Sequence, residues 1–590
     1  MSRSRFAAVV VAVVAVLALP AAAQGATEAR VSVGSPASPF PQNKQNEPGL
    51  AIDPTNPSVV AAGANDEIDV APCDGADCPF TEGVGVSGIY FSFNGGSSWS
   101  QPTYQGYSAR DGSPGPGPIG TLPNFYENGL VSDGDPVLAY GPKPNGRGGF
   151  TYADGARLYY ASLAATFPGS AAFKGFEAIT VSHTDNAQAA AAGSENAWSD
   201  PVIATKQSST TFSDKEAIWA DNARSSKYFG NVYLCYTQFR SNAGPPEPIY
   251  FARSTNGGRS FEKAYHLSPA YNSSQNPGRQ GCAVRTDSKG NVYATWEDTV
   301  KKHSVFRMAI STDGGRKFGK PTVVAQVTDV GTFDGVRSIS FDGVAGARTS
   351  SFPSLDIANG APAGNGPDTL AIGWSDGADG LNHEHALVQL SADRGSHWTA
   401  PRPVEQAGDR PDFAFIGISP DGTDLYTVYD GFLDPFRLNT TATRRFQGVL
   451  RHSNVRGTSL SGTSTLHRGA IGDARASSAN SLIDEFLGDY NTVDATNGGA
   501  VAVFNDARDA AVCPAINAFR QDFVDQGGTG EIGEVDERDE EPLAEGDAPA
   551  PALDCPPTFG NTDIWSAAAA DPNPLAGRRL AGQRRPRRRP

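Results

Sequence analysis

Charged residues are scarce in this sequence, and basic residues are the scarcer kind. Only 19% of the 590 residues are charged, with 48 Lys and Arg against 64 Asp and Glu, so the formal net charge is −16. This excess of negative charge argues against a general nucleic-acid binder. Hydrophobic residues still make up 39% of the chain. The composition therefore excludes a disordered polymer and a coiled coil, and predicts a globular protein with a large core.

Long apolar runs are missing after the first 23 residues. Arg3 and Arg5 precede an apolar run at 6–19, and small residues follow at 21–23. This order is typical of a secretory signal peptide, and the run is shorter than the roughly 20 residues that cross a bilayer. We therefore predict a signal peptide at residues 1–23 and a secreted, extracellular protein without a transmembrane segment.

Common catalytic and metal-binding motifs are also absent. The sequence has no Gly-x-Ser-x-Gly element, no P-loop and no His-Glu-x-x-His segment. It has six cysteines, and none has the Cys-x-x-Cys spacing of zinc or redox sites. An even number of cysteines in an exported chain favours disulfides, with free buried thiols as the alternative. Pairing by neighbourhood predicts Cys73–Cys78, Cys235–Cys282 and Cys513–Cys555.

Turn-forming residues, in contrast, are abundant, with 66 glycines and 43 prolines. They suggest an all-β protein with one repeat architecture, rather than the three or four domains that the length alone suggests. Four segments share the pattern Ser-x-Asx-x-Gly-x-x-aromatic. In such a hairpin turn the Asx side chain caps backbone amides, glycine takes a positive φ, and the aromatic ring packs over the turn. The pattern residues are Ser92, Asn94, Gly96 and Trp99; Ser254, Asn256, Gly258 and Phe261; Ser311, Asp313, Gly315 and Phe318; Ser391, Asp393, Gly395 and Trp398.

This pattern resembles the Asp box, or bacterial neuraminidase repeat, of sialidases and related β-propellers. The resemblance implies a propeller of the sialidase-like superfamily. In that family the box is a structural turn away from the active centre, so the four turns bear on architecture rather than on chemistry.

A second repeat sets the number of units. Segments 230–236 and 290–296 are near copies, and looser strand–turn–strand versions recur along the chain. Seven units of about 65 residues each fit four-stranded blades with loops. We predict one β-propeller domain at residues 24–573 with six or seven blades, seven preferred. The units lie at 47–65, 135–154, 214–238, 280–298, 351–375, 410–430 and 487–506.

The last unit lacks a fourth strand, because the chain becomes polar after residues 562–567. The segment 28–33 alternates in the β manner and precedes the first unit. We predict that it supplies the missing edge strand, since propellers close their rings to hide strand edges. A short helix is expected within 187–198.

Two charged segments lie near the C-terminus. Residues 521–554 contain twelve acids and one base, and are predicted to be a disordered surface insertion without function. Residues 574–590 carry seven arginines and no acid, and are predicted to be a disordered tail. The tail is either a plain chain end or an anchor to anionic cell-surface polymers or lipids.

Charged residues at the starts of the units are the candidate functional residues. The first strand of each propeller blade lines the central channel, and ligands bind where those strands begin. An alternative interpretation is that these residues form hydrogen bonds and salt bridges between blades around a wet channel. They are Glu47, Asp135, Asp214, Lys215, Glu216, Arg279, Arg348, Arg410, Asp489 and Tyr490, with Asp506 and Arg508 after the second strand of the last unit.

The resemblance to sialidases implies roles for these residues. Sialidases hold the sugar carboxylate with arginines, whose planar guanidinium matches it bidentately. They use a tyrosine nucleophile with a glutamate partner, and an aspartate as acid/base. By resemblance the catalytic residues are Tyr490, Glu216 and Asp135, with Asp66 as the alternative acid. The substrate-binding residues are Arg279, Arg348, Arg410, Glu47, Asp214 and Asp489. The family's early Phe-Arg-Ile-Pro-type motif, which supplies the first arginine, is absent, since residues 46–50 read Asn-Glu-Pro-Gly-Leu.

Two functions remain open from the sequence. The first is a secreted glycoside hydrolase on acidic sugars, and the alternative is a non-catalytic glycan- or protein-binding propeller at the cell envelope. Neither needs a cofactor, and no metal ligands are predicted, although the ring of channel carboxylates could hold a hard cation such as calcium. The expected partner is a carbohydrate or cell-envelope polymer, not nucleic acid, and we expect a monomer.

Overall fold

The computed structural model describes residues 25–73, 75, 78–240, 245–271, 273, 278–334, 338–341, 344–345, 351–437, 439–525 and 549–574. The predicted signal peptide lies outside these residues. So do Arg348, residues 526–548 of the predicted insertion and residues 575–590 of the predicted tail.

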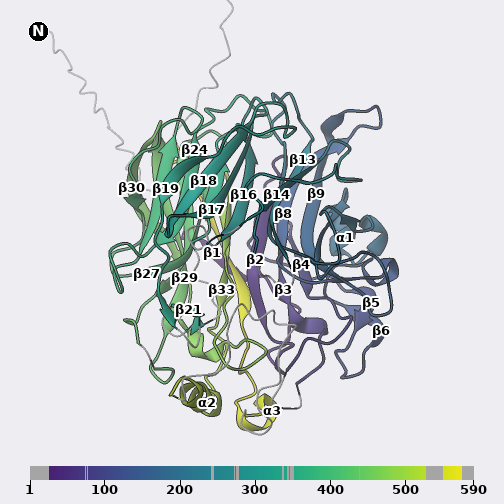
Figure 1. Ribbon diagram of the computed structural model, residues 1–590, viewed down its shortest axis with the longest axis vertical. Helices are drawn as coiled ribbons and strands as arrows, with labels where there is room; N and C mark the ends of the chain where they lie inside the picture. The colour runs from purple at the N-terminus through teal and green to yellow at the C-terminus, as the bar shows by residue number, and fades with distance from the viewer. Residues whose placement is uncertain are drawn as a thin grey trace, which may run out of the picture.

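The chain forms a seven-bladed β-propeller, as preferred from the sequence (Figure 1). The first strands of neighbouring blades contact one another around the whole ring, in the order β2, β8, β12, β16, β23, β27, β32 and back to β2. Blade 1 contains β2 (Gln45–Ile52), β3 (Val60–Asp66) and β4 (Ser87–Ser92). Blade 2 contains β8 (Val137–Pro144), β9 (Phe150–Thr166), β10 (Ala178–Thr184) and β11 (Val202–Ile203), with β7 (Leu130–Ser132) beside β9. Blade 3 contains β12 (Thr211–Ala220), β13 (Val232–Arg240), β14 (Ile249–Ser254) and β15 (Tyr265–His266).

The remaining blades continue in chain order, and the seven predicted units coincide with the first two strands of the seven blades. Blade 4 contains β16 (Arg279–Thr286), β17 (Val292–Val300), β18 (His303–Ser311) and β19 (Thr322–Gln326), and blade 5 contains β23 (Ser354–Ile357), β24 (Leu370–Asp376), β25 (His385–Ser391) and β26 (Arg402–Pro403). Blade 6 contains β27 (Arg410–Ile418), β28 (Asp424–Phe432), β29 (Arg445–Arg456) and β30 (Ser459–Arg468), with β31 (Gly472–Asp473) beside β29. Blade 7 contains β32 (Thr492–Thr496), β33 (Gly499–Asp506), β34 (Asp563–Ala570) and β1 (Thr27–Arg30).

The other elements lie in connections between strands. They are the hairpin β5 (Tyr104–Ser108) and β6 (Gly115–Ile119); the small sheet β20 (Thr332–Asp334), β21 (Ser338–Phe341) and β22 (Val344–Ala345); helices α1 (Ala187–Ala191), α2 (Pro514–Asp525) and α3 (Pro551–Asp554); and 3-10 turns η1 (Glu67–Asp69), η2 (Tyr126–Asn128), η3 (Glu195–Ala197) and η4 (Ala474–Ala476). The short helix expected within 187–198 is confirmed as α1 followed by η3. The two ends of the predicted insertion are helical, in α2 and α3.

The N-terminal strand closes the ring. β1 pairs antiparallel with β34, with Thr27 opposite Ala568 and Arg30 opposite Trp565. Blade 7 therefore takes its outermost strand from the other end of the chain, which confirms the prediction made for residues 28–33. Closure leaves β34 without an open edge.

Strand alternation defines two faces of the disc. Every innermost strand begins at one face, here called the start face, and ends at the other, called the end face. The connection from β33 to β34 carries α2 and α3, so both helices cover the start face, and Figure 1 shows them together at the bottom of the view. The hairpins between third and fourth strands lie at the end face.

The four Ser-x-Asx-x-Gly turns lie at the end face, and in each the Asx side chain accepts a hydrogen bond from a backbone amide, as predicted. The serine hydroxyl adds two further bonds. In the first turn, the Ser92 hydroxyl donates to Asn94 Oδ1 at 2.9 Å and accepts from the Gly96 amide at 2.9 Å. The same pair of bonds recurs in the other three turns. The turn also locks neighbouring blades, because the Trp99 indole donates to Ser566 Oγ of blade 7 at 2.8 Å.

The three predicted disulfides are confirmed: Cys73–Cys78, Cys235–Cys282 and Cys513–Cys555. The second joins β13 of blade 3 to β16 of blade 4. In the part of the chain that the structure describes, no helix is long and apolar enough to cross a membrane.

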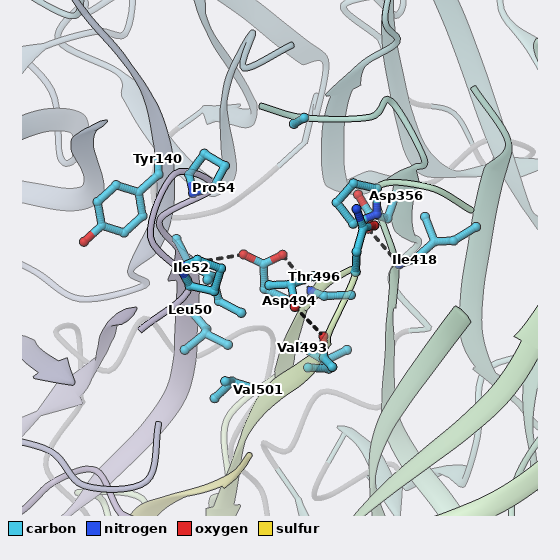
Figure 2. Close-up of a pocket in the computed structure, with 18 of the residues that line it drawn as sticks. Leu50, Ile52, Pro54, Tyr140, Asp356, Ile418, Val493, Asp494, Thr496 and Val501 are labelled. Atoms are coloured by element: carbon cyan, nitrogen blue, oxygen red, sulfur yellow. Dashed lines mark hydrogen bonds between the residues drawn. The ribbon is translucent and has the colours of Figure 1, made fainter. Parts of the chain in front are cut away.

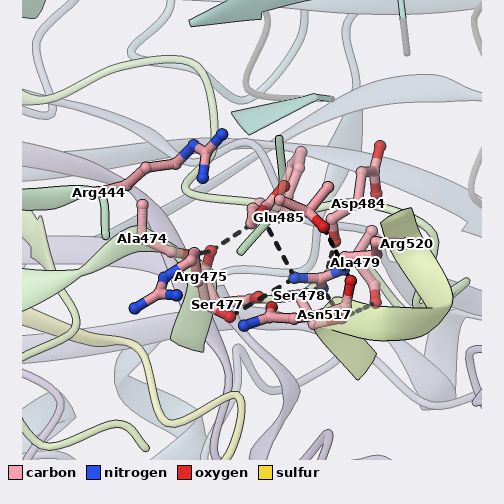
Figure 3. Close-up of polar contacts among 12 residues, drawn as sticks. Arg444, Ala474, Arg475, Ser477, Ser478, Ala479, Asp484, Glu485, Asn517 and Arg520 are labelled. Carbon is pink, nitrogen blue, oxygen red and sulfur yellow. Dashed lines mark hydrogen bonds and ion pairs between the residues drawn. The ribbon is translucent and has the colours of Figure 1, made fainter. Parts of the chain in front are cut away.

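A buried polar network attaches α2 to the start face (Figure 3). Arg520 is fully buried and donates to the Leu482 carbonyl at 3.0 Å, to Ser478 Oγ at 2.9 Å and to the Asp484 carbonyl at 2.7 Å. Glu485, also fully buried, lies 3.7 Å from this guanidinium. Backbone carbonyls thus replace the water that a buried arginine loses, and the helix is fixed over blade 7.

Candidate functional site

The innermost strands begin with bulges that turn side chains into the channel. The register shifts by an extra residue near the start of β2, β12, β16 and β27. The bulged residues take left-handed backbone conformations at Glu47 (φ 56°), Lys215 (φ 52°), Gly281 (φ 62°) and Phe413 (φ 50°), and Asp135 before β8 does the same (φ 48°). Non-glycine residues seldom adopt this conformation, and bulges commonly re-aim side chains near functional sites.

Four blades contribute side chains to one polar group in the channel near the start face. The Asn65 amide group, at the end of β3, donates to Glu47 Oε2 at 2.6 Å, and its carbonyl accepts from the Asp135 backbone amide at 2.7 Å. The Lys215 ammonium pairs with Asp489 and lies 3.4 Å from Asp135 Oδ2. We call Glu47, Asn65, Asp135, Asp214, Lys215, Glu216, Asp489 and Tyr490 the channel group.

Burial raises the pKa of two carboxyl groups of the channel group. It raises the pKa of Glu47 well above the usual value, and the charges of Asp135 and Asp489 raise it further, whereas Lys215 opposes them. Burial, followed by the charges of Asp135 and Asp214, likewise raises the pKa of Glu216. A raised pKa favours the protonated form of a carboxyl group, and that form can donate a proton to a bound molecule.

Tyr490 lies among these carboxyl groups. Burial raises the pKa of its hydroxyl well above 10, and the charges of Asp135, Glu47, Glu216 and Asp489 act in the same direction. Its ring packs edge-on against Phe415, with the ring centres 6.3 Å apart. The raised pKa keeps the hydroxyl neutral, and Asp135 is the nearby acid with the largest charge effect on it.

A cavity of about 150 Å³ adjoins the channel group, lined by Lys215, Glu216, Tyr490, Phe352 and Phe415 among others. Acidic, basic and aromatic side chains thus line one cavity. Such a combination can bind a polar ligand and transfer protons to it.

A wider pocket of about 570 Å³ occupies the end-face half of the channel (Figure 2). Its carboxylates join neighbouring inner strands: Asp494 accepts from the Ile52 amide at 2.8 Å, and Asp356 accepts from the Ile418 amide at 2.8 Å. These two acids therefore fit the alternative interpretation of channel acids as links between blades.

The predicted arginines are not part of the channel group. Arg410 makes a two-point ion pair with Glu384, at 2.9 and 3.0 Å. Arg279 lies 3.4 Å from Asp298 and donates to the Tyr271 carbonyl at 2.9 Å. Arg348 lies outside the described residues. Arg508, at blade 7, pairs with Asp506 and Glu28.

The structure therefore brings together Tyr490, Glu216, Asp135, Glu47, Asp214 and Asp489, whereas Arg279 and Arg410 form ion pairs with Asp298 and Glu384. Sequence reasoning missed Asn65 and the central role of Lys215. Both carried a weak signal: Asn65 ends the second strand of the first unit, and Lys215 stands between two acids. Among the described residues, the group of side chains suited to a metal ion lies elsewhere, at Asp424, His452 and Asp571.

The fold and the site define a seven-bladed β-propeller with a carboxyl-rich central channel. No protein-family model matches the chain, and no curated protein matches it. The fold is similar to those of known sialidases and other glycan-active propellers. A Hadza microbial sialidase has 11% identity over 75% of this chain and 73% of its own, with a TM-score of 0.37.

Two further solved structures resemble the chain in the same way. An ulvan lyase, a polysaccharide lyase, has 9% identity over 79% of this chain and 92% of its own, with a TM-score of 0.41. The endosialidase of phage phi92 has 10% identity over 96% of this chain and 72% of its own, with a TM-score of 0.40. These likenesses concern the fold, and the blade count rests on the strand pairing itself.

Proposed function

We propose that this protein is a carbohydrate-active propeller that hydrolyses glycosidic bonds at the channel group. One observation carries the proposal: Tyr490 and Glu216 line one cavity, close to the carboxyl groups of Glu47 and Asp135 from two other chain segments. Folding buries these acids and puts Glu47 and Lys215 in left-handed backbone conformations, and both effects cost free energy. Energetic costs of this kind concentrate at functional sites.

The chemistry of glycoside hydrolysis assigns the roles. A protonated carboxyl group gives its proton to the departing sugar oxygen, while a nucleophile attacks the anomeric carbon. Glu216, whose pKa is raised by burial, fits the acid. Tyr490 fits the nucleophile, with Asp135 taking the hydroxyl proton, because Asp135 exerts the largest charge effect on that hydroxyl. This exchanges the roles of Glu216 and Asp135 expected from the resemblance.

The substrate that fits best is an uncharged sugar. An acidic sugar needs an arginine to match its carboxylate, but Arg279 and Arg410 are engaged by Asp298 and Glu384. The channel group itself contains five acids and Lys215, so a negatively charged sugar would meet repulsion there.

The test is hydrolysis of a panel of aryl glycosides that includes neutral sugars and an aryl sialoside. We expect release of the aryl group from a neutral member, and a loss of about 100-fold or more in kcat with Glu216→Gln and with Tyr490→Phe. Glu177→Gln, at an equally buried glutamate of blade 2, and Tyr271→Phe, at an exposed tyrosine, are matched controls that keep the wild-type rate.

Two results would contradict this function. One is no turnover of any glycoside, even if oligosaccharides are retained, since retention alone describes a binding propeller. The other is turnover that survives in Glu216→Gln and Tyr490→Phe while both proteins keep the wild-type thermal midpoint. Selective cleavage of the sialoside would overturn the assignment of a neutral substrate.

We also propose that the protein is secreted and acts outside the cell. The three disulfides favour an oxidising compartment. Expression with the native N-terminus should release a product into the medium that begins at Gln24. A cell-retained product that still carries residues 1–23 would contradict this.

A further inference from the structure

A compact group of ligand-type side chains lies at the end face, where blade 6 meets blade 7. Asp424, His452 and Asp571 each offer one ligand atom, and these atoms lie within 4.8 Å of one another. His452 Nε2 is 3.0 Å from Asp424 Oδ1. Asp424 and His452 are buried, and Asp571 is half-buried. This group is on the opposite face from the channel group and takes no part in the proposed hydrolysis.

Strand register explains why these residues meet. Tyr426 of β28 is the direct cross-strand partner of His452 of β29. Asp424 precedes Tyr426 by two residues, so all three side chains project from the same side of blade 6. Tyr426 packs there against alanines of blade 7. Asp571 follows the last residue of β34 and thus reaches the group from blade 7.

An unpartnered buried group points to a missing ligand. The Tyr426 side chain is fully buried, and its hydroxyl has no hydrogen-bond partner among the described residues. The Tyr426 ring lies beside the His452 ring, with the ring centres 5.2 Å apart. His452 Nδ1 is likewise buried without a partner in the described part of the chain. Such groups are costly unless something satisfies them.

We propose that Asp424, His452 and Asp571 bind one divalent metal ion of the zinc class, beside the buried Tyr426 side chain. Imidazole nitrogen and carboxylate oxygen are both ligand types of Zn²⁺, and three such ligands leave a fourth position for water or for Tyr426. Ca²⁺ prefers six or more oxygen ligands, which this group does not offer. The ion would join blade 6 to blade 7 next to the strands that close the ring.

The experiment uses the full-length protein after treatment with EDTA and dialysis. Isothermal titration calorimetry with ZnCl₂ should give one ion per chain, and ZnCl₂ should raise the thermal midpoint. Asp571→Asn should weaken zinc binding by about tenfold or more and remove most of the rise in midpoint. Asp571 is half-buried, so this variant keeps the fold. His452→Gln, at the fully buried ligand, should lose binding as well.

His467→Gln is the matched control, because His467 lies on β30 of the same blade and contacts Glu28 instead of this group. It should bind zinc as the wild type does. Absence of zinc binding to the wild type overturns the proposal. So does zinc binding that Asp571→Asn leaves unchanged, because the ion would then lie elsewhere. Tighter binding of CaCl₂ than of ZnCl₂ overturns the assignment of the ion.

Discussion

Lys215 reaches the centre of the channel group through a backbone conformation that lysine seldom adopts. Its φ of 52° lies in the left-handed region, which costs on the order of 1–3 kcal/mol for a residue other than glycine. In return its ammonium pairs with Asp489 and lies 3.4 Å from Asp135 Oδ2. Water cannot replace this partner at buried carboxylates, so Lys215 offsets the negative charge of Asp135 and Asp489.

Removal of this cation is therefore predicted to destabilise the fold. Lys215→Met leaves Asp135 and Asp489 without their buried partner, and the free energy of unfolding should fall by about 3 kcal/mol. Urea unfolding at neutral pH measures it. Lys289→Met is the matched control: Lys289 pairs with Asp368 at 3.8 Å, but 63% of its side chain is exposed, so a change of at most about 1 kcal/mol is expected. Equal losses in the two variants would contradict the role of Lys215.

Asp412, on β27, predicts a dependence of stability on pH. Burial raises its pKa from 3.8 to about 8, and the nearby Glu384 and Asp489 charges contribute. Between these values the folded protein holds a proton that the unfolded chain has lost, so stability falls as pH rises. One such group gives a slope of about −1.4 kcal/mol per pH unit.

Asp412→Asn should remove that slope. Urea unfolding free energies of wild type and variant, measured at several values between about pH 5 and pH 8, should converge at the acid end and separate toward the basic end, with the variant the more stable. Asp393→Asn, at an exposed turn, should run parallel to the wild type over this range. Parallel profiles for Asp412→Asn as well would contradict the raised pKa.

Residues at the starts of the innermost strands could be predicted to belong to the channel group. Glu47, Asp135 and Tyr490 stand at such starts, and propeller topology alone sends those positions to the channel. The positions of the arginine side chains were not predictable. Arg410 forms an ion pair with Glu384 of the preceding blade, and no local pattern links two residues 26 positions apart. Pairing across blades depends on tertiary distances that sequence order does not contain.

The hairpin turn is the element in which local sequence and blade packing act together. Ser311 Oγ donates to Asp313 Oδ1 at 2.8 Å and accepts from the Gly315 amide at 3.0 Å. Gly315 lies at φ 77°, and a Cβ there would come within 2.8 Å of Phe251 of blade 3. The turn thus holds blade 4 tightly against its neighbour.

Ser311→Ala should therefore cost about 1–2 kcal/mol, because it leaves the buried Gly315 amide without its acceptor. The midpoint of urea or thermal unfolding measures the loss. Ser97→Ala, at an exposed variable position of the first such turn, should change the free energy of unfolding by no more than about 0.5 kcal/mol. If Ser311→Ala is as stable as Ser97→Ala, the hydroxyl is not needed for the turn.

Pairs of adjacent strands were predictable, because each pair carries its own turn residues and its own alternation of apolar and polar residues. The segment 280–298, for example, forms β16 and β17. The bulges at the starts of those strands were not. Glycine at position 281 signals a left-handed residue, but Glu47, Lys215 and Phe413 adopt the same conformation without any such signal. There the ring of packed blades imposes the conformation against local preference.

On the scale of the whole molecule, one short strand holds the ring closed. β1 contributes four residues that pair with β34, and its Glu28 accepts hydrogen bonds from Arg508 of blade 7 at 2.6 and 2.9 Å and from His467 of blade 6 at 3.0 Å. Arg30 adds an ion pair with Asp563 at 2.9 Å. The closing strand is therefore bonded to both of the last two blades.

Removal of this strand should open the ring. A chain that begins at Ser32 exposes the edge of β34, which can then pair with another chain. We expect a lower thermal midpoint and concentration-dependent association by light scattering, relative to a control chain that begins at Gly25. A synthetic peptide of residues 25–33 should restore the monomer, because it supplies the same register against β34. A shortened chain that stays monomeric with the midpoint of the control would show that seven blades hold together without the closing strand.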